Sequence, residues 1–125
     1  TVVSQSDYLS LHLHLHEETT HLIDERLLAL MKPTACLINV ARGALVDEDA
    51  LYRALMDDMI GGAGLDVFSR EPPDVNHPVF ELPQVVSTPH IAGCTDGTSR
   101  KRAACAAQNV DRIAEGLEPL YRIDL

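Results

Sequence analysis

The 125-residue sequence predicts an α/β fold built on an open, parallel β-sheet. Short apolar segments of strand length alternate with segments of helical periodicity, and strands joined by helices are typical of parallel sheets. Hydrophobic residues make up 46% of the chain, which is enough for a packed core and excludes a disordered protein. No apolar run reaches the roughly 18 residues that a membrane-spanning helix needs.

The first half of the chain predicts two strands and a helix. Leucines alternate with polar residues over Tyr8–Leu15, which is the pattern of a strand. Asp24 is expected to cap a short helix over Glu25–Met31, which Pro33 stops. Ala35–Val40 is a continuous apolar run, typical of a parallel strand that is covered on both faces.

The next segments predict a helix and two further strands. Asp47 is expected to begin a helix that ends near Asp57, and the glycine-rich strand Ile60–Val67 leaves room for a closely packed neighbour. Phe68–Gln84 is rich in proline and turns, and Val85–Thr88 follows as a short strand.

A last helix is predicted over residues 98–116, where Gly116 suits the positive φ of a helix end. Its apolar face is expected to join the core. The order of elements is therefore βαβαββα.

Composition limits the partners and the compartment. Ten Lys and Arg against 19 Asp and Glu give a net charge of −9, which disfavours nucleic acid and anionic membranes and points to a small molecule or another protein. The three cysteines include no CxxC pair, so neither a disulfide framework nor a zinc knuckle is indicated. With no secretory signal at the start of the chain, we expect a cytoplasmic protein.

Three loops carry residues suited to proton transfer on an anion. Arg42 follows the second predicted strand, Glu71 the third and His90 the fourth. Because ligands bind beyond the carboxyl ends of parallel strands, these side chains are expected at one edge. An arginine can hold a carboxylate, and a histidine with a pKa of about 6.5 can exchange a proton when a carboxylate supports it.

Three segments in register carry a family resemblance. INVARGALVDEDAL (Ile38–Leu51), GAGLDVFSREPP (Gly62–Pro73) and STPHIAG (Ser87–Gly93) resemble the D-isomer-specific 2-hydroxyacid dehydrogenases, over a stretch from about Asp7 to Gly116. The resemblance implies a Rossmann-like domain and hydride transfer between NAD, or NADP, and a 2-hydroxy or 2-oxo acid. Phosphoglycerate dehydrogenases and glyoxylate/hydroxypyruvate reductases are enzymes of this type.

The resemblance also implies residue roles. Arg42 would bind the substrate carboxylate and carbonyl, His90 would move the proton, and Glu71 would support His90. Asp66 would bond the nicotinamide amide. The implied cofactor contacts are Leu13, Val40, Ala41, Arg42, Asp66, His90, Ile91, Ala92 and Gly93. One stretch departs from the family pattern LHxPLT, because His14 and His16 replace its proline and threonine.

The glycine-rich phosphate-binding turn of a dinucleotide fold is missing, since no GxGxxG occurs in these residues. Residues 1–116 are therefore expected to be the C-terminal half of an NAD(P)-binding domain, with residues 117–125 as a tail. The N-terminal half of the same protein is the expected partner, within a homodimer. This chain alone is expected to be inactive.

Other interpretations remain at this point. A non-catalytic NAD-sensing corepressor of the same family would keep the same three residues, as would a phosphite dehydrogenase. His12, His14 and His16 alternate on a predicted strand, where they would suit a zinc-binding module. A polar stripe at the cofactor edge explains them better, and no metal is expected.

Overall fold

The computed structural model describes residues 2–123 and divides between Ile91 and Ala92 into two compact units. The outermost residues of the predicted 1–116 and 117–125 segments, residue 1 and residues 124–125, lie outside the described part. Among the described residues, no helix is long and apolar enough to cross a membrane.

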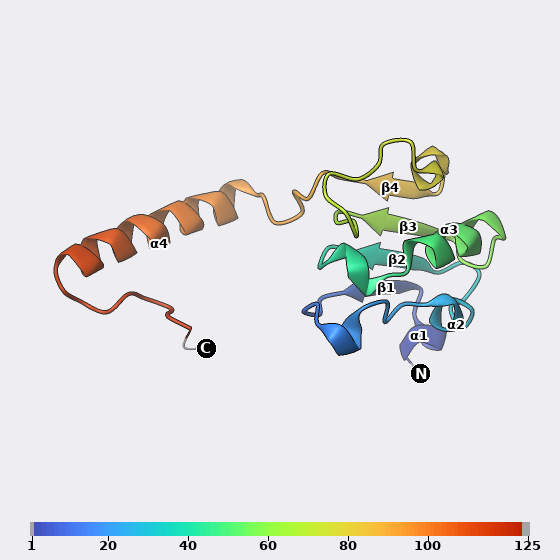
Figure 1. The fold of residues 1–125 in the computed structure, drawn as a ribbon, viewed down its shortest axis with the longest axis horizontal. Coiled ribbons are helices and arrows are strands. Elements are labelled where there is room, and N and C mark those ends of the chain that lie inside the picture. The colour runs from blue at the N-terminus through green and yellow to red at the C-terminus, as the bar shows by residue number, and fades with distance from the viewer. Residues whose placement is uncertain (1, 124–125) are drawn as a thin grey trace. The chain divides into compact units, whose positions relative to one another are not determined.

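The first unit is a four-stranded parallel sheet with the order β1-β2-β3-β4 (Figure 1). The strands are β1 (Tyr8–Leu11), β2 (Cys36–Asn39), β3 (Gly62–Leu65) and β4 (Val85–Ser87). Their last residues are partners in register, because Leu11 pairs with Asn39, Asn39 with Leu65, and Leu65 with Ser87. The loops after all four strands therefore leave the sheet along one line. The predicted α/β class with a parallel sheet is confirmed.

Helices α2 (Glu25–Leu28) and α3 (Glu48–Met56) connect the first three strands. Both begin as predicted: Asp24 accepts the Leu27 N–H at 3.0 Å, and Asp47 accepts the Ala50 N–H at 2.9 Å. A short helix that the sequence analysis did not predict, α1, spans Val2–Gln5, and 3₁₀ turns span Glu17–Thr19 (η1), Gly43–Leu45 (η2) and Pro78–Glu81 (η3).

The core lies between the sheet and helices α2 and α3. Leu28 of α2 and Leu51 and Leu55 of α3 are fully buried together with Leu37 of β2. On the opposite face of the sheet, Tyr8 is 72% exposed and Val86 69% exposed. Within the first unit, helices therefore cover one face only, and the second cover expected for this sheet is not supplied by residues 2–91.

The first strand is shorter than predicted. β1 ends at Leu11, where its partner β2 also ends, and the chain beyond has no strand to pair with. His12, His14 and His16 therefore lie in irregular backbone and not on a strand face. The geometric premise of the zinc-binding interpretation is wrong for this reason.

The second unit contains helix α4 (Asp96–Ala114). It begins earlier than predicted because Thr95 caps it in a reciprocal pair with Thr98, and Gly116 has the expected positive φ of 74°. After the helix, Asn109 holds the backbone of Leu120 through two hydrogen bonds of 2.7 and 3.2 Å. Within the second unit, α4 contains no buried residue, and the expectation that its apolar face joins the core stays a prediction.

Candidate active site

The three predicted catalytic residues follow the aligned ends of β2, β3 and β4. Arg42 lies directly before the 3₁₀ turn η2, Glu71 lies in the loop after β3, and His90 lies in the turn after β4. The sheet register thus brings together residues that are far apart in the sequence, as the sequence analysis expected.

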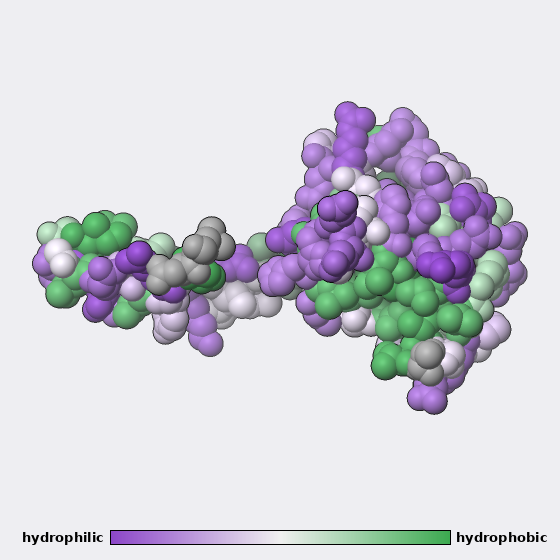
Figure 2. Space-filling view, turned by 60° about the horizontal axis from the view of Figure 1, so that its bottom comes forward, coloured by the Kyte–Doolittle hydropathy of each residue, from purple (hydrophilic) through white to green (hydrophobic). Residues whose placement is uncertain are grey.

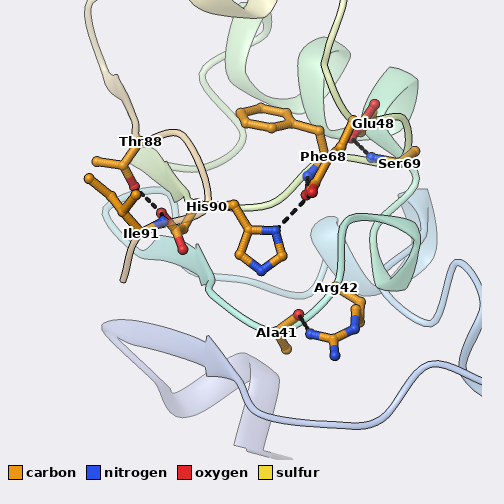
Figure 3. Close-up of polar contacts among 10 residues, drawn as sticks. Ala41, Arg42, Glu48, Phe68, Ser69, Thr88, His90 and Ile91 are labelled. Carbon is orange, nitrogen blue, oxygen red and sulfur yellow. Dashed lines mark hydrogen bonds and ion pairs between the residues drawn. The ribbon is translucent and has the colours of Figure 1, made fainter. Parts of the chain in front are cut away.

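His90 and Glu71 form a direct pair. Nδ1 of His90 lies 2.8 Å from Oε2 of Glu71, and the other carboxylate oxygen accepts the N–H of Phe68 at 3.2 Å. Since a carboxylate only accepts, Nδ1 carries the hydrogen of this bond. The Nε2 corner of the ring then remains for a ligand, and in Figure 3 it points toward Ala41 and Arg42.

The pair has an electrostatic consequence for Glu71. The hydrogen bond from His90 is the largest cause that lowers the pKa of the Glu71 carboxyl below its usual range, and the Phe68 N–H lowers it further. Glu71 is therefore ionised at neutral pH. The ionised carboxylate accepts the hydrogen on Nδ1 and so fixes the orientation of the His90 ring.

This lowered pKa predicts a pH-dependent stability. A carboxyl whose pKa is lowered by folding stabilises the fold above its unfolded pKa, and this contribution disappears as the pH falls through the folded pKa. We expect Glu71→Gln to lower the free energy of unfolding at neutral pH by less than about 1 kcal/mol, because the pair is solvent-accessible. The difference should vanish in acid. Urea unfolding over a pH series measures it.

Glu81→Gln is the matched control, because it removes the same charge from an exposed residue of η3. A Glu71→Gln difference that persists unchanged into strong acid, or that Glu81→Gln reproduces, would contradict the assignment of the stabilisation to the His90 pair.

Two loops of the site touch backbone to backbone at Gly43. A Cβ placed on Gly43 would lie 1.8 Å from the carbonyl carbon of Phe68 and 2.2 Å from the nitrogen of Ser69. The N–H of Ser69 also donates to Oε1 of Glu48, the first residue of α3, at 2.7 Å. The loop with Arg42 and the loop with Glu71 are therefore fixed against each other.

Part of the expected cofactor site forms a hollow beside Arg42. Leu13, Ala41 and Arg42 line a cavity of about 240 Å³ together with His12 and His14. Arg42 itself is exposed, and its Nη1 donates to the carbonyl of Ala41 at 2.6 Å. His14, which departs from the family pattern, thus contributes to this hollow.

The remaining expected cofactor residues lie at four places in the chain. Val40 follows β2, Asp66 is buried directly after β3, and Ile91 is exposed beside His90. Ala92 and Gly93 belong to the second unit. No group of three or more metal-ligating side chains is present in the part of the chain that the structure describes.

Sequence reasoning missed three residues that shape the site. Asn39 lies within the apolar run Ala35–Val40, yet it is buried and bonds the backbone of Ala41 and Arg42. Thr88, which bonds Asp66, and Glu48, which bonds Ser69, act across long sequence distances. Only Asn39 could have been found from the sequence, because it is a polar residue within an apolar strand.

The fold and the site define a class of protein: an α/β domain whose loops at the carboxyl edge of a parallel sheet carry an Arg, a Glu–His pair and a hollow of mixed polar and apolar lining. The family "D-isomer specific 2-hydroxyacid dehydrogenase, NAD binding domain" matches residues 1–92. The chain belongs to this family.

Known proteins resemble the chain over most of its length. Glyoxylate/hydroxypyruvate reductase B of Pectobacterium carotovorum subsp. carotovorum (strain PC1) is 52% identical over 93% of the chain, which spans only 36% of that protein. A D-isomer specific 2-hydroxyacid dehydrogenase of Lactobacillus delbrueckii ssp. bulgaricus, solved with NAD, has a TM-score of 0.89 and 35% identity over 98% of this chain and 42% of its own. An acyclic imino acid reductase solved with NADPH and D-Arg has a TM-score of 0.85 and 35% identity. The match covers 98% of this chain and 39% of the reductase.

Proposed function

We propose that this chain supplies the proton-transfer part of an NAD(P)-dependent reductase of 2-oxo acids that acts on glyoxylate or hydroxypyruvate. The observation that carries the proposal is the 2.8 Å pair of His90 and Glu71 at the sheet edge that also carries Arg42. The identity to a glyoxylate/hydroxypyruvate reductase supports this substrate class.

The side chains suggest how the reaction proceeds. Arg42 gives up its contact with the Ala41 carbonyl and binds the substrate carboxylate through its fork of donors. His90 donates the proton on Nε2 to the carbonyl oxygen as C2 is reduced, and the reverse reaction returns it. Glu71 holds the ring through Nδ1, which leaves Nε2 for the substrate.

The residues present suit one end of a dinucleotide. The cavity of about 240 Å³ beside Arg42 has Leu13 and Ala41 in its wall, which suits the flat, partly apolar nicotinamide ring. When bound, NADH or NADPH supplies the hydride. No GxGxxG turn for the pyrophosphate occurs in the sequence, so that contact must come from other residues.

The test uses a longer polypeptide that contains this chain together with the remaining segments of such an enzyme. We expect it to oxidise NADH or NADPH, followed by absorbance, when glyoxylate or hydroxypyruvate is added. Arg42→Gln should raise KM for the acid by about 10²-fold or more, because a charge-assisted bidentate contact is lost.

Three outcomes would contradict this proposal. Cofactor binding without turnover of any 2-oxo acid would favour a corepressor-like binding module. Oxidation of phosphite in place of 2-hydroxy acids would favour the phosphite dehydrogenase type. Unchanged KM in Arg42→Gln would remove the assigned role of Arg42.

A second measurement concerns the 125 residues alone. Because they lack a phosphate-binding turn, we expect them to bind NAD weakly or not at all and to show no turnover. Isothermal calorimetry checks this expectation. Micromolar affinity of the isolated chain for NAD would show that the phosphate-binding turn is not needed.

Further segments of the same protein are the proposed partner. β1 is an edge strand of the described sheet, and within the first unit no helix covers the sheet face with Tyr8 and Val86. Figure 2 shows hydrophobic residues gathered on one area of the first unit, and Val2, Leu13, Leu15, Leu22 and Leu30 are exposed. Such surfaces suit further strands and helices of one domain.

The assembly and its location are also proposals. We propose a homodimer in the cytoplasm. The cytoplasm agrees with three cysteines that form no disulfide. The net charge of −9 disfavours nucleic acid and anionic membranes as partners. Light scattering of the longer polypeptide tests the dimer.

A further inference from the structure

Two buried polar side chains stand at the ends of neighbouring strands. Asn39 is 1% exposed and ends β2, and Asp66 is 3% exposed and directly follows β3; they are the buried polar or charged residues of the described core. The Asp66 N–H donates to the Asn39 carbonyl at 3.0 Å, so the two are adjacent. Burial of such groups costs free energy unless they are hydrogen-bonded. The hydrogen-bond partners of these two side chains therefore indicate what each side chain does.

Asn39 bonds the loop that carries Arg42. Its Nδ2 donates to the carbonyl of Arg42 at 2.9 Å, and its Oδ1 accepts the N–H of Ala41 at 3.2 Å. The Asn39 side-chain amide thus bonds both the Ala41 N–H and the Arg42 carbonyl, in the loop that follows β2. The backbone from which the Arg42 side chain projects is fixed by this amide.

Asp66 bonds the turn that carries His90. Its Oδ1 accepts both the hydroxyl of Thr88, at 2.5 Å, and the N–H of Ile91, at 2.8 Å (Figure 3). These two donors lie on either side of His90 in the sequence. A carboxylate anchored on β3 therefore clamps both ends of the turn.

The backbone conformation of His90 explains why the turn needs these two hydrogen bonds from Asp66. His90 has a φ of 56°, in the left-handed region that is unfavourable for a residue with a side chain. One local bond, from the His90 N–H to the Thr88 carbonyl at 3.0 Å, supports the turn from within. Such a conformation persists only when surrounding contacts impose it, and the Asp66 carboxylate provides two of them.

We propose that Asn39 and Asp66 are a pair of positioning residues, each of which holds the loop of one catalytic side chain: Asn39 for Arg42 and Asp66, through Thr88 and Ile91, for His90. The proposal deepens the proposed function, because it concerns how these two side chains are placed for the reaction. It is separate from the nicotinamide contact that the family resemblance implies for Asp66.

The test measures placement and needs no turnover, so it remains decisive if the proposed reaction is wrong. In the 125-residue chain, carboxyl-carbon NMR follows the titration of Glu71, and backbone shifts report φ at His90. Thr88→Val, which removes one donor of the clamp, should raise the pKa of Glu71 toward its usual range, because the largest cause of its lowering is the contact with His90. Thr88→Ser keeps the hydroxyl and should restore the lowered pKa.

The Asp66 and Asn39 variants complete the comparison. Asp66→Asn keeps an acceptor oxygen, so the backbone chemical shifts of His90 should stay as in the wild type. Asp66→Leu has no acceptor, so these shifts should change. Asn39→Leu should instead increase the fast backbone motion of Ala41 and Arg42, measured by ¹⁵N relaxation, and leave the φ-dependent shifts of His90 unchanged. Each residue is thus expected to affect its own loop.

Asp47→Ala is the matched control, because it removes a carboxylate that also accepts a backbone N–H, at 2.9 Å, at the start of α3. It should lower stability and leave the pKa of Glu71 as it is. The proposal is overturned if folded Thr88→Val keeps the wild-type Glu71 titration and His90 shifts, or if Asp47→Ala changes them equally. Should Asp66→Leu fail to fold, Thr88→Val decides, because Thr88 is an exposed residue.

Discussion

Replacement of His90 by asparagine in the complete enzyme is expected to lower kcat by about 10²- to 10⁴-fold, the usual contribution of a positioned general acid or base. Asparagine tolerates the positive φ of 56° at this position, so the backbone of the turn should persist. It cannot exchange a proton near neutral pH. The change should therefore fall on kcat, while NADH affinity, measured by fluorescence titration, stays within a few-fold of wild type.

His21→Asn is the matched control. His21 is also an exposed histidine with a positive φ, of 52°, but it lies in the segment before α2 and away from the Glu71 loop in sequence. It should retain wild-type kcat. A His90→Asn enzyme that keeps kcat within about threefold of wild type would exclude His90 as the general acid.

Replacement of Gly43 by alanine is expected to destabilise the first unit by more than about 3 kcal/mol, above the usual cost of forcing an extra methylene into a packed interior. The new Cβ would lie 1.8 Å from the Phe68 carbonyl carbon, and backbone atoms cannot rotate away as a side chain can. The loops of Arg42 and Glu71 would have to separate. Urea unfolding followed by circular dichroism measures the loss.

Gly97→Ala makes the same chemical change where there is space. Its Cβ would come no closer than 3.9 Å to the Thr95 hydroxyl, and Gly97 lies within α4, where alanine favours the helix by up to about 1 kcal/mol. The two variants should therefore change stability in opposite directions. Equal effects would show that the Gly43 contact is not the cause.

Local signals in the sequence predicted most of the secondary structure. The capping residues Asp24 and Asp47 form the expected bonds because a cap depends on residues only three positions apart. The length of β1 was not predictable in this way, because the strand stops where its partner β2 stops. Leucines continue to alternate up to Leu15, so the pattern alone extends the strand too far.

The position of the candidate residues at one edge of the sheet was predictable from the sequence. Arg42, Glu71 and His90 were identified from their places after predicted strands and from the family resemblance, and the aligned register brings them to one edge. The contacts of Asn39 and Thr88 could not be derived, because they depend on where neighbouring loops turn. Periodicity gave the apolar face of α4 but not what covers that face, because periodicity carries no information on neighbouring elements.

The division of the chain after Ile91 has a consequence for how such an enzyme can change during evolution. Arg42, Glu71 and His90 all belong to the first unit, and their loops are fastened to each other through Gly43 and to the sheet through Asn39 and Asp66. On the proposed function, a recombination event that exchanges segments outside this unit would leave the spacing of the three proposed catalytic side chains unchanged. Substrate preference could then change without a change in the contacts that hold these loops.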